Sequence, residues 1–330
     1  MLSLRRGTVT AVTERLEGLV RLEVDGRSCV AYPRLTGPVA LGDEVVVNVQ
    51  AVELELGTGG FDVLHVNLTR GLDLRAEPEA HVMKLPYTSL QHAVLHAEEA
   101  GIERESLGGL PVVCCSLHSQ VAPVCAGIGK GRRVAYVQLP GGALPVSFSD
   151  TVRALRARGL VERSVAVGAC FDGDIACVST AAALLWAAQE GFDAVVCAIG
   201  PGIAGTASAF GHGGMAAAES IWTARTLGGR PILTVRYSEG DERERHHGIS
   251  HHTRAVLTLA GKAELGWPSK LETPEGLANL TPVEVDGWRE ACEGLPLSHM
   301  GRGPDEDPAF FEAAFAAGRL VSRSFVESSY

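Results

Sequence analysis

The chain has 330 residues, of which 46% are hydrophobic and 21% are charged, a composition typical of a globular protein with a large core. Its net charge of −10, without any run of Lys or Arg, argues against nucleic acid or an anionic membrane as a partner. No apolar stretch is long enough to span a bilayer and the N-terminus lacks a signal-peptide pattern, so we expect a cytoplasmic protein.

Residues 1–70 are expected to form a small all-β domain. Short apolar runs alternate there with turn signals, as in "LVRLEVDGRSCVAYP", where Asp25-Gly26 is a hairpin signal and the period of two indicates a strand with one solvated face. A barrel of the OB-like or SH3-like kind fits this pattern. Such barrels serve many functions, so this domain predicts no activity by itself.

Residues 71–110 are interpreted as a polar linker followed by a helix. The stretch "TSLQHAVLHAEEAG" predicts a helix that is capped at or next to Thr88 and ends at Gly101. His92 and His96 would then lie one turn apart, a spacing that suits a metal but more often serves packing or lies at the surface.

Residues 111–265 contain five successive strand–helix units, whose strands are "PVVCCSL", "RVAYVQL", "SVAVGAC", "DAVVCAI" and "PILTVRY". Nearly continuous apolar strands that alternate with helices indicate strands buried on both faces. We therefore expect an α/β domain with a mostly parallel, doubly wound sheet, three-layer α/β/α and Rossmann-like or flavodoxin-like. Residues 266–330 are expected to add a C-terminal helical cap.

The eight cysteines include no C-x-x-C motif, and most lie inside apolar runs. They are interpreted as small core residues of a protein in a reduced compartment. Cys115 and Cys170, near strand ends, leave a nucleophilic cysteine as the alternative.

The carboxyl ends of the predicted strands are the expected place for a site, because open parallel sheets bind ligands at that edge. The loops there are long and rich in glycine and polar residues, whereas connectors at the opposite edge, such as "EGFD" and "LGGRP", are short. We expect a small-molecule ligand at this edge. The candidate substrate-binding residues are Ser116, Gly142, Gly202, Gly205, Thr206, His212 and Arg236. The candidate catalytic residues are His118, Asp172, His247, His251 and His252.

The segment "GPGIAG", beginning at Gly200, matches G-x-G-x-x-G without the context of a dinucleotide site. It follows the fourth strand, its helix begins only near Gly213, and the next strand ends in Arg236 instead of an acidic residue. NAD binding is therefore not expected, and no cofactor is assigned. The loop either presents backbone N–H groups to a phosphate or carboxylate, with Thr206 as a further donor, or it is purely structural.

Two further candidates follow other strands. His118 lies between two serines, where it suits either a general base or a buried histidine with satisfied hydrogen bonds. Asp172 and Asp174 flank a glycine and could act as a carboxylate pair. Asp174 is interpreted as the cap of the helix that follows, which leaves Asp172 as the site candidate.

The stretch "RERHHGISHHTRAV" places four histidines close together. Ser250 is predicted to be a helix N-cap, so that His251 and His252 lie in the first turn, where the helix dipole favours neutral rings. Neutral imidazole can accept a proton or bind metal. Because Gly248 breaks a shared face between His247 and His251, a complete metal site would need ligands from other loops, and no metal is assigned.

The segments "HVMKLPYTSLQ", "SLHSQ", "GPGIAGT", "RHHGISHHT" and "MGRGPDEDPAFF" together resemble a bacterial family of uncharacterised proteins, a domain of unknown function. The resemblance covers nearly the whole chain and implies no activity.

The residues themselves favour an enzyme that acts on a small anionic or nucleotide-like substrate by histidine acid–base chemistry, with Arg236 steering the anion. One alternative is a metal-dependent hydrolase that uses Asp172 and several histidines. The other is a non-catalytic protein that binds a metabolite or a partner. A homo-oligomer is compatible with the sequence, which determines neither the substrate nor the oligomeric state.

Overall fold

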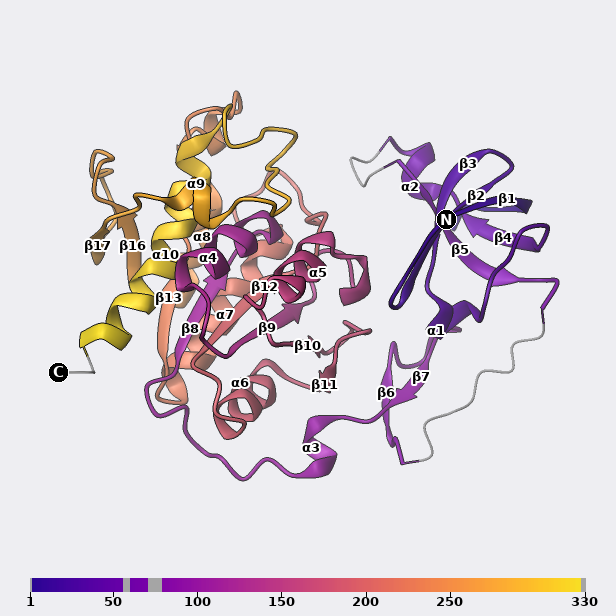
Figure 1. The fold of residues 1–330 in the computed structure, drawn as a ribbon, viewed down its shortest axis with the longest axis horizontal. Coiled ribbons are helices and arrows are strands. Elements are labelled where there is room, and N and C mark those ends of the chain that lie inside the picture. The colour runs from indigo at the N-terminus through magenta and orange to yellow at the C-terminus, as the bar shows by residue number, and fades with distance from the viewer. Residues whose placement is uncertain (1, 56–59, 71–78, 328–330) are drawn as a thin grey trace. The chain divides into compact units, whose positions relative to one another are not determined.

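The computed structural model describes residues 2–55, 60–70 and 79–327. The chain divides into two compact units, Met1–Val94 and Leu95–Tyr330 (Figure 1). Within the described part, no helix combines the length and the apolar character needed to cross a bilayer.

The first unit contains a closed five-stranded barrel in the order β1-β2-β3-β5-β4, as the β-rich pattern predicts. Asp25 and Gly26 both have positive φ, 50° and 75°, and form the predicted tight turn between β2 and β3. Buried residues such as Leu22 and Val45 fill the barrel. The strands are β1 (Leu4–Leu16), β2 (Leu19–Val24), β3 (Arg27–Ala31), β4 (Glu44–Asn48) and β5 (Asp62–Asn67). Two short helices, α1 (Pro33–Thr36) and α2 (Gln50–Glu53), belong to the same unit.

The helix predicted to end at Gly101 is mostly absent. Strand β7 (His92–Val94) pairs instead with β6 (Val82–Lys84), and only α3 (Ala97–Ala100) is helical. His92 and His96 therefore do not share a helix. Cross-strand hydrogen bonds have overridden a local helix preference that is weak over so short a segment.

The second unit is built on a six-stranded sheet in the order β11-β10-β9-β12-β8-β13, in which every neighbouring pair is parallel. Its strands are β8 (Pro111–Cys115), β9 (Val134–Leu139), β10 (Arg163–Val167), β11 (Ile175–Cys177), β12 (Ala194–Ile199) and β13 (Arg230–Leu233). The five predicted strands are all present. Because β12 lies between β9 and β8, the order differs from both the Rossmann and the flavodoxin orders.

Strand β11 is an addition that the sequence analysis missed, and it corrects the role of Asp174. Asp174 caps no helix. Its Oδ2 accepts hydrogen bonds from the backbone N and the Oγ of Ser164, at 2.7 and 2.9 Å, and so joins the start of β10 to β11. Helix α6 (Thr180–Gln189) begins later and is capped by Ser179, whose side chain accepts from Ala182 N.

Helices cover both faces of this sheet, and the strand residues alternate between the two sides. Val113 and Cys115 pack into one hydrophobic cluster, whereas Val112 and Cys114 pack into the other. The first cluster includes residues of α4 (Val121–Ile128), α5 (Asp150–Ala157), α9 (Trp288–Ala291) and α10 (Pro308–Glu327). The second includes residues of α6, α7 (Ala216–Thr226) and α8 (His251–Ala260).

The C-terminal part of the chain contributes directly to the core. Helix α10 crosses α4 where Gly318 faces Gly127, and a Cβ atom at Gly318 would lie 2.0 Å from Val124 O. Only glycine allows these backbones to approach so closely. Three short strand pairs lie outside the main sheet and the barrel in the described part of the chain: β6 with β7, β14 (Tyr237–Ser238) with β15 (Gly248–Ile249), and β16 (Leu265–Pro268) with β17 (Leu280–Val283).

Candidate functional site

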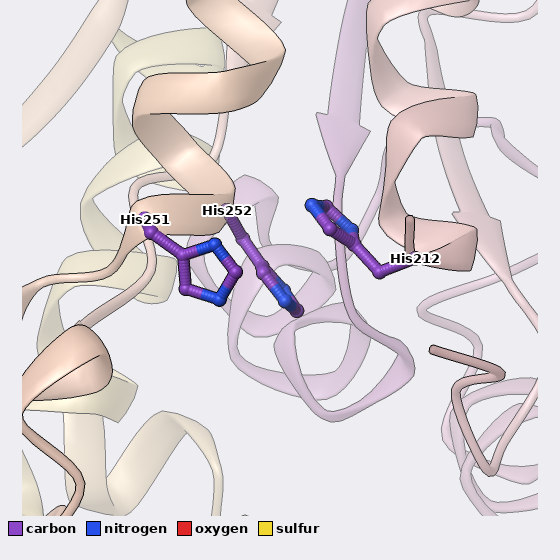
Figure 2. A group of neighbouring side chains, drawn as sticks. All are labelled: His212, His251 and His252. Carbon is purple, nitrogen blue, oxygen red and sulfur yellow. The ribbon is translucent and has the colours of Figure 1, made fainter. Parts of the chain in front are cut away.

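Four histidines gather beyond the carboxyl ends of β12 and β13. We call His212, His246, His251 and His252 the histidine cluster. His212 lies in the connection from β12 to α7, and the other three lie at or just before the start of α8. Figure 2 shows His251 and His252 extending from the first turn of α8 toward His212, which comes from a separate segment.

The rings of the histidine cluster are in contact with one another. His212 and His252 are stacked, with ring centroids 3.6 Å apart and an interplanar angle of 12°. The ring of His251 stands edge-on to His252, with centroids 4.5 Å apart, and that of His246 lies 4.8 Å from His251.

Ser250 fixes the start of α8, as the sequence predicts. Its Oγ accepts a hydrogen bond from His252 N at 3.2 Å and shares another, at 2.8 Å, with His246 Nδ1. Just upstream, β14 pairs with β15, and Gly248 has a φ of +66°. One serine thus both caps the helix and orients a ring of the cluster.

Hydrogen-bond partners assign the same tautomer, with the hydrogen on Nε2, to both stacked rings, but they engage opposite nitrogens. Nδ1 of His252 lies 2.9 Å from Nη1 of Arg236, and because a guanidinium only donates, Nδ1 accepts and the ring hydrogen is on Nε2. Nε2 of His212 lies 3.1 Å from Ala209 O, and because a carbonyl only accepts, this nitrogen carries the hydrogen. Nδ1 of His212 is then a lone pair, buried and without a hydrogen-bond partner. The pair therefore offers one proton acceptor and one N–H donor.

The rings of the cluster are neutral at neutral pH. Burial, followed by the charge of Arg236, lowers the pKa of His252 to about 2 and that of His246 to about 3. The same two causes lower the pKa of His251. For His212 the largest cause is again burial, followed by His251. A neutral ring can accept a proton or donate an N–H without carrying charge.

Arg236 is the buried charge of the site. Its side chain is 2% exposed, and its Nε is buried without a hydrogen-bond partner. Burial, with Arg243 nearby, lowers its pKa to about 10, so the guanidinium remains charged at neutral pH. Asp241 lies 3.9 Å from Nη2 of Arg236 but is bonded to Arg243 at 2.6 Å and to Arg302 at 3.1 Å. Arg236 therefore shares its counter-ion with two other arginines.

His118 belongs to a different hydrogen-bond network. Its Nδ1 donates to Ile199 O at 3.1 Å, and its Nε2 accepts from Ser149 Oγ at 2.7 Å. Tyr136 packs edge-on against the ring, and burial lowers the pKa of His118 to about 4. Both ring nitrogens are occupied, which supports the second of the two interpretations, a buried histidine with satisfied hydrogen bonds.

Asp172, His247 and Thr206 also lie outside the histidine cluster. Asp172 follows β10, which is three strand positions from β8, or about 14 Å at a spacing of about 4.8 Å, and it accepts a hydrogen bond from Ser147 Oγ. The side chain of His247 is exposed. Thr206 is exposed as well, and its Oγ1 bonds to Ser208 Oγ at 2.8 Å.

The glycines of the neighbouring loops serve close backbone packing. A Cβ atom at Gly142 would lie 2.1 Å from Gly200 O, and one at Gly200 would lie 2.0 Å from Ala143 O. The N–H groups of Ala143, Ala204, Thr206 and Gly213 all donate to backbone carbonyls. These contacts support the structural interpretation of the loop over a phosphate cradle.

Two candidate residues next to His212 position it. Gly205 forms a β-bridge with His212, and a Cβ atom there would lie 3.1 Å from His212 Cβ. A Cβ atom at Gly214 would lie 3.0 Å from His212 Nδ1 and 3.3 Å from Ser116 Cβ, so Gly214 lies between the fully buried Ser116 and this nitrogen. Gly202 has a φ of +72° and no neighbour that a side chain would meet.

Residues that the sequence analysis did not select complete the surroundings. His246 is in the quoted histidine stretch, but nothing in that stretch distinguishes it from the exposed His247. Asp241 and Arg243 lie in the same loop, and no local periodicity marks them. His299 and Arg302 come from a segment about fifty residues further along the chain, and only the tertiary structure brings them near Arg236.

Three of the histidines could hold a metal after rearrangement. Nitrogens of His212, His251 and His252 lie within 4.8 Å of one another. Tetrahedral zinc with Zn–N bonds of about 2.1 Å needs about 3.4 Å between ligand atoms. The stacked rings direct their lone pairs along parallel planes, and Arg236 occupies Nδ1 of His252. The present geometry therefore departs from metal coordination and places a lone pair and an N–H donor beside the buried guanidinium of Arg236.

Comparison with known proteins gives a family but no activity. A family model described as "Protein of unknown function (DUF3866)" matches residues 28–318, a range that begins in β3 and ends in α10. A search of curated proteins found no match.

Proposed function

Because the chain belongs to DUF3866, a family of proteins of unknown function, we propose its activity from the geometry of the site. The protein is an enzyme that binds a small anionic substrate at Arg236 and transfers a proton with His212 and His252. The observation that carries this proposal is the stacked pair of rings beside a buried guanidinium, in which opposite nitrogens are engaged, so that His212 presents a lone pair and His252 an N–H.

Each group has a distinct role. His212 Nδ1 accepts a proton from the substrate or from a water molecule, because it is the buried lone pair of the site. His252 donates its Nε2–H to the substrate oxygen on which negative charge develops. Arg236, which donates to the other nitrogen of that ring, draws electron density from it and strengthens the donor. A neutral histidine with a lowered pKa is a known electrophile of this kind.

The charges around the site favour an anion over a cation. Two carboxylates, Asp241 and Asp307, face three arginines, Arg236, Arg243 and Arg302, and the neutral histidines add no charge. One positive charge is therefore in excess within this ion-pair network, and Arg245 adds a further positive charge nearby. A carboxylate, a phosphate or the phosphate of a nucleotide-like compound would balance it.

A metal-dependent hydrolase is the second candidate, and the three nitrogens within 4.8 Å favour it. It would use the histidines without Asp172, which follows β10, three strand positions from β8. Zinc content measured after incubation with Zn²⁺ and dialysis separates the two candidates. One equivalent of zinc in the native protein and none in His212→Ala would support the hydrolase, whereas no retained zinc would contradict it.

Binding of inorganic phosphate, measured by calorimetry, tests the anion site. We expect Arg236→Met to bind at least about tenfold more weakly than the native protein, because the guanidinium supplies the compensating charge. His247→Ala is the matched control, since this exposed histidine lies in the same stretch but outside the cluster, and it should bind normally. Equal phosphate affinity in Arg236→Met would contradict the proposal.

Turnover is tested with a mixture of phosphorylated and carboxylated metabolites followed by NMR. We expect the native protein and His247→Ala to convert at least one component, and His212→Ala to be slower by about 100-fold or more, as for loss of a general base. Conversion at the native rate by His212→Ala would contradict its role. Phosphate binding without any turnover would favour the non-catalytic, metabolite-binding alternative.

The finer structural and cellular assignments are also proposals. Helices on both faces of the parallel sheet support a three-layer α/β/α class for the second unit. The eight cysteines are all buried, as small core residues are, and we propose a cytoplasmic location as the sequence analysis does.

A further inference from the structure

His299 is a buried histidine whose surroundings leave one nitrogen unused. It is 2% exposed, and its Nε2 is buried without a hydrogen-bond partner. A buried polar atom without a partner is unfavourable for folding, and such atoms in native proteins call for an explanation. The proton-transfer roles proposed above do not use this ring.

The ring of His299 is held firmly in place. It stacks on Phe310 with centroids 3.8 Å apart and an interplanar angle of 2°. Its Nδ1 lies 3.3 Å from Ser119 Oγ, next to the carboxyl end of β8. The backbone of His299 pairs with Arg302 in both directions across a tight turn in which Met300 and Gly301 have positive φ. This orientation is thus maintained by contacts from three segments of the chain.

Arg302 connects His299 to the surroundings of Arg236. Its backbone pairs with His299, and its side chain bonds at 3.1 Å to Asp241, which lies 3.9 Å from Nη2 of Arg236. Burial, and then the charges of Arg236 and Arg302, lower the pKa of His299 to about 3. Arg236 acts in the same way on His246, His251 and His252. Arg236 therefore influences two sets of histidines, the cluster at the start of α8 and His299 before α10, and its own Nε is unpartnered.

We propose that His299 forms a second subsite of the same site, and that the substrate is a small molecule with two acidic groups, one bound at Arg236 and the other hydrogen-bonded to His299 Nε2. When the Ser119 hydroxyl donates to Nδ1, the ring hydrogen is on Nε2 and can be donated to a carboxylate oxygen. Arg302, paired to His299 through the backbone, makes the surroundings positive and favours an anionic group over a hydroxyl. This inference rests on the proposed function, because it takes Arg236 as the first anion-binding group.

The test compares the affinities of simple acids for the full-length protein by calorimetry. Malonate, succinate and glutarate sample the spacing between two carboxylates, and butyrate is the probe with one. We expect at least one diacid to bind about tenfold or more tightly than butyrate. In His299→Gln this advantage should disappear while the affinity for butyrate stays unchanged, because only the second contact is lost.

A measurement of folding and two further variants serve as controls. Thermal unfolding shows whether His299→Gln is folded. If it is not, Ser119→Ala, which removes the partner of Nδ1 but leaves the ring, should reduce the diacid advantage severalfold. His247→Ala should retain the advantage. The inference is overturned if no diacid exceeds butyrate in the native protein, or if the advantage persists in a folded His299→Gln. If the native protein binds none of these acids, the result would instead contradict the proposed function.

Discussion

The ring of His252 contacts a charged group at its edge and an aromatic ring on its face. The guanidinium of Arg236 donates to Nδ1 at 2.9 Å, and the ring of His212 stacks on its face at 3.6 Å. An imidazolium at this position would be buried beside a positive charge, which is unfavourable on both counts. The side chain is therefore suited to donate an N–H in its neutral form.

Replacing Arg236 should change the titration of His252. We expect Arg236→Met to raise the pKa of His252 from about 2, because one cause of its lowering, the guanidinium charge, is removed. The pKa should stay below the ordinary value of about 6.5 because the ring remains buried. NMR of the ring nitrogens against pH measures this change. Arg254→Met, an exposed arginine on the same helix, is the control and should leave the pKa unchanged.

Helix α8 links a local sequence signal to the geometry of the site. Its N-cap, Ser250, accepts from His252 N and also bonds to His246. Helix α6 has an equivalent cap in Ser179, which accepts from Ala182 N and lies at the start of a different helix from the cluster residues. The two caps therefore allow the stability of a helix end to be separated from the arrangement of the rings.

Removing either cap should destabilise the protein, but only one removal should affect ligand binding. We expect Ser250→Ala and Ser179→Ala each to lower the free energy of unfolding by about 1 kcal/mol, the usual contribution of an N-cap. Only Ser250→Ala should weaken phosphate binding, since it frees the His246 ring and the first turn of α8. Urea unfolding and calorimetry measure the two effects. Equal phosphate affinity in the two variants would show that the cap does not organise the site.

At the scale of the whole molecule, the second unit buries several histidines in their neutral form. Burial lowers the pKa of His118 to about 4 and is also the largest cause for His246 and His299, each at about 3. In the unfolded chain these groups have their ordinary pKa of about 6.5. Between those values the unfolded chain binds protons that the folded protein does not bind.

The second unit should therefore lose stability as the pH falls below about 6.5. The stability from these neutral rings is fully present above the unfolded pKa and decreases toward the folded values, by up to about 1.4 kcal/mol per pH unit for each histidine. All four tryptophans, Trp186, Trp222, Trp267 and Trp288, lie in this unit, so their fluorescence in urea reports on it. His246→Gln should reduce the pH dependence of the free energy of unfolding by the contribution of one bound proton. A free energy of unfolding that stays constant from pH 6.5 to 5 in the native protein would contradict this account.

The main elements of this protein could be predicted from its sequence. Apolar runs with a period of two, or without any polar interruption, identified the barrel and the five main parallel strands, because burial on one or both faces of a strand is visible in consecutive residues. The cap at Ser250 was predicted for the same reason, since capping depends on a few neighbouring residues. The helix before Gly101 was predicted wrongly, because pairing between β6 and β7 outweighed a weak local preference.

Only the tertiary structure decided which residues meet. Strand order depends on packing between distant segments, and the insertion of β12 between β9 and β8 separates Asp172 from the histidines at the start of α8. The same packing brings His212, Arg236 and His252 together, places His118 in another hydrogen-bond network, and adds His299 from the segment before α10. The tautomer of His212 is set by the carbonyl of Ala209, three residues away, whereas that of His252 depends on the guanidinium of Arg236, which lies beside it only in the folded chain. Spacing along the sequence carries no information about the contacts between these distant segments.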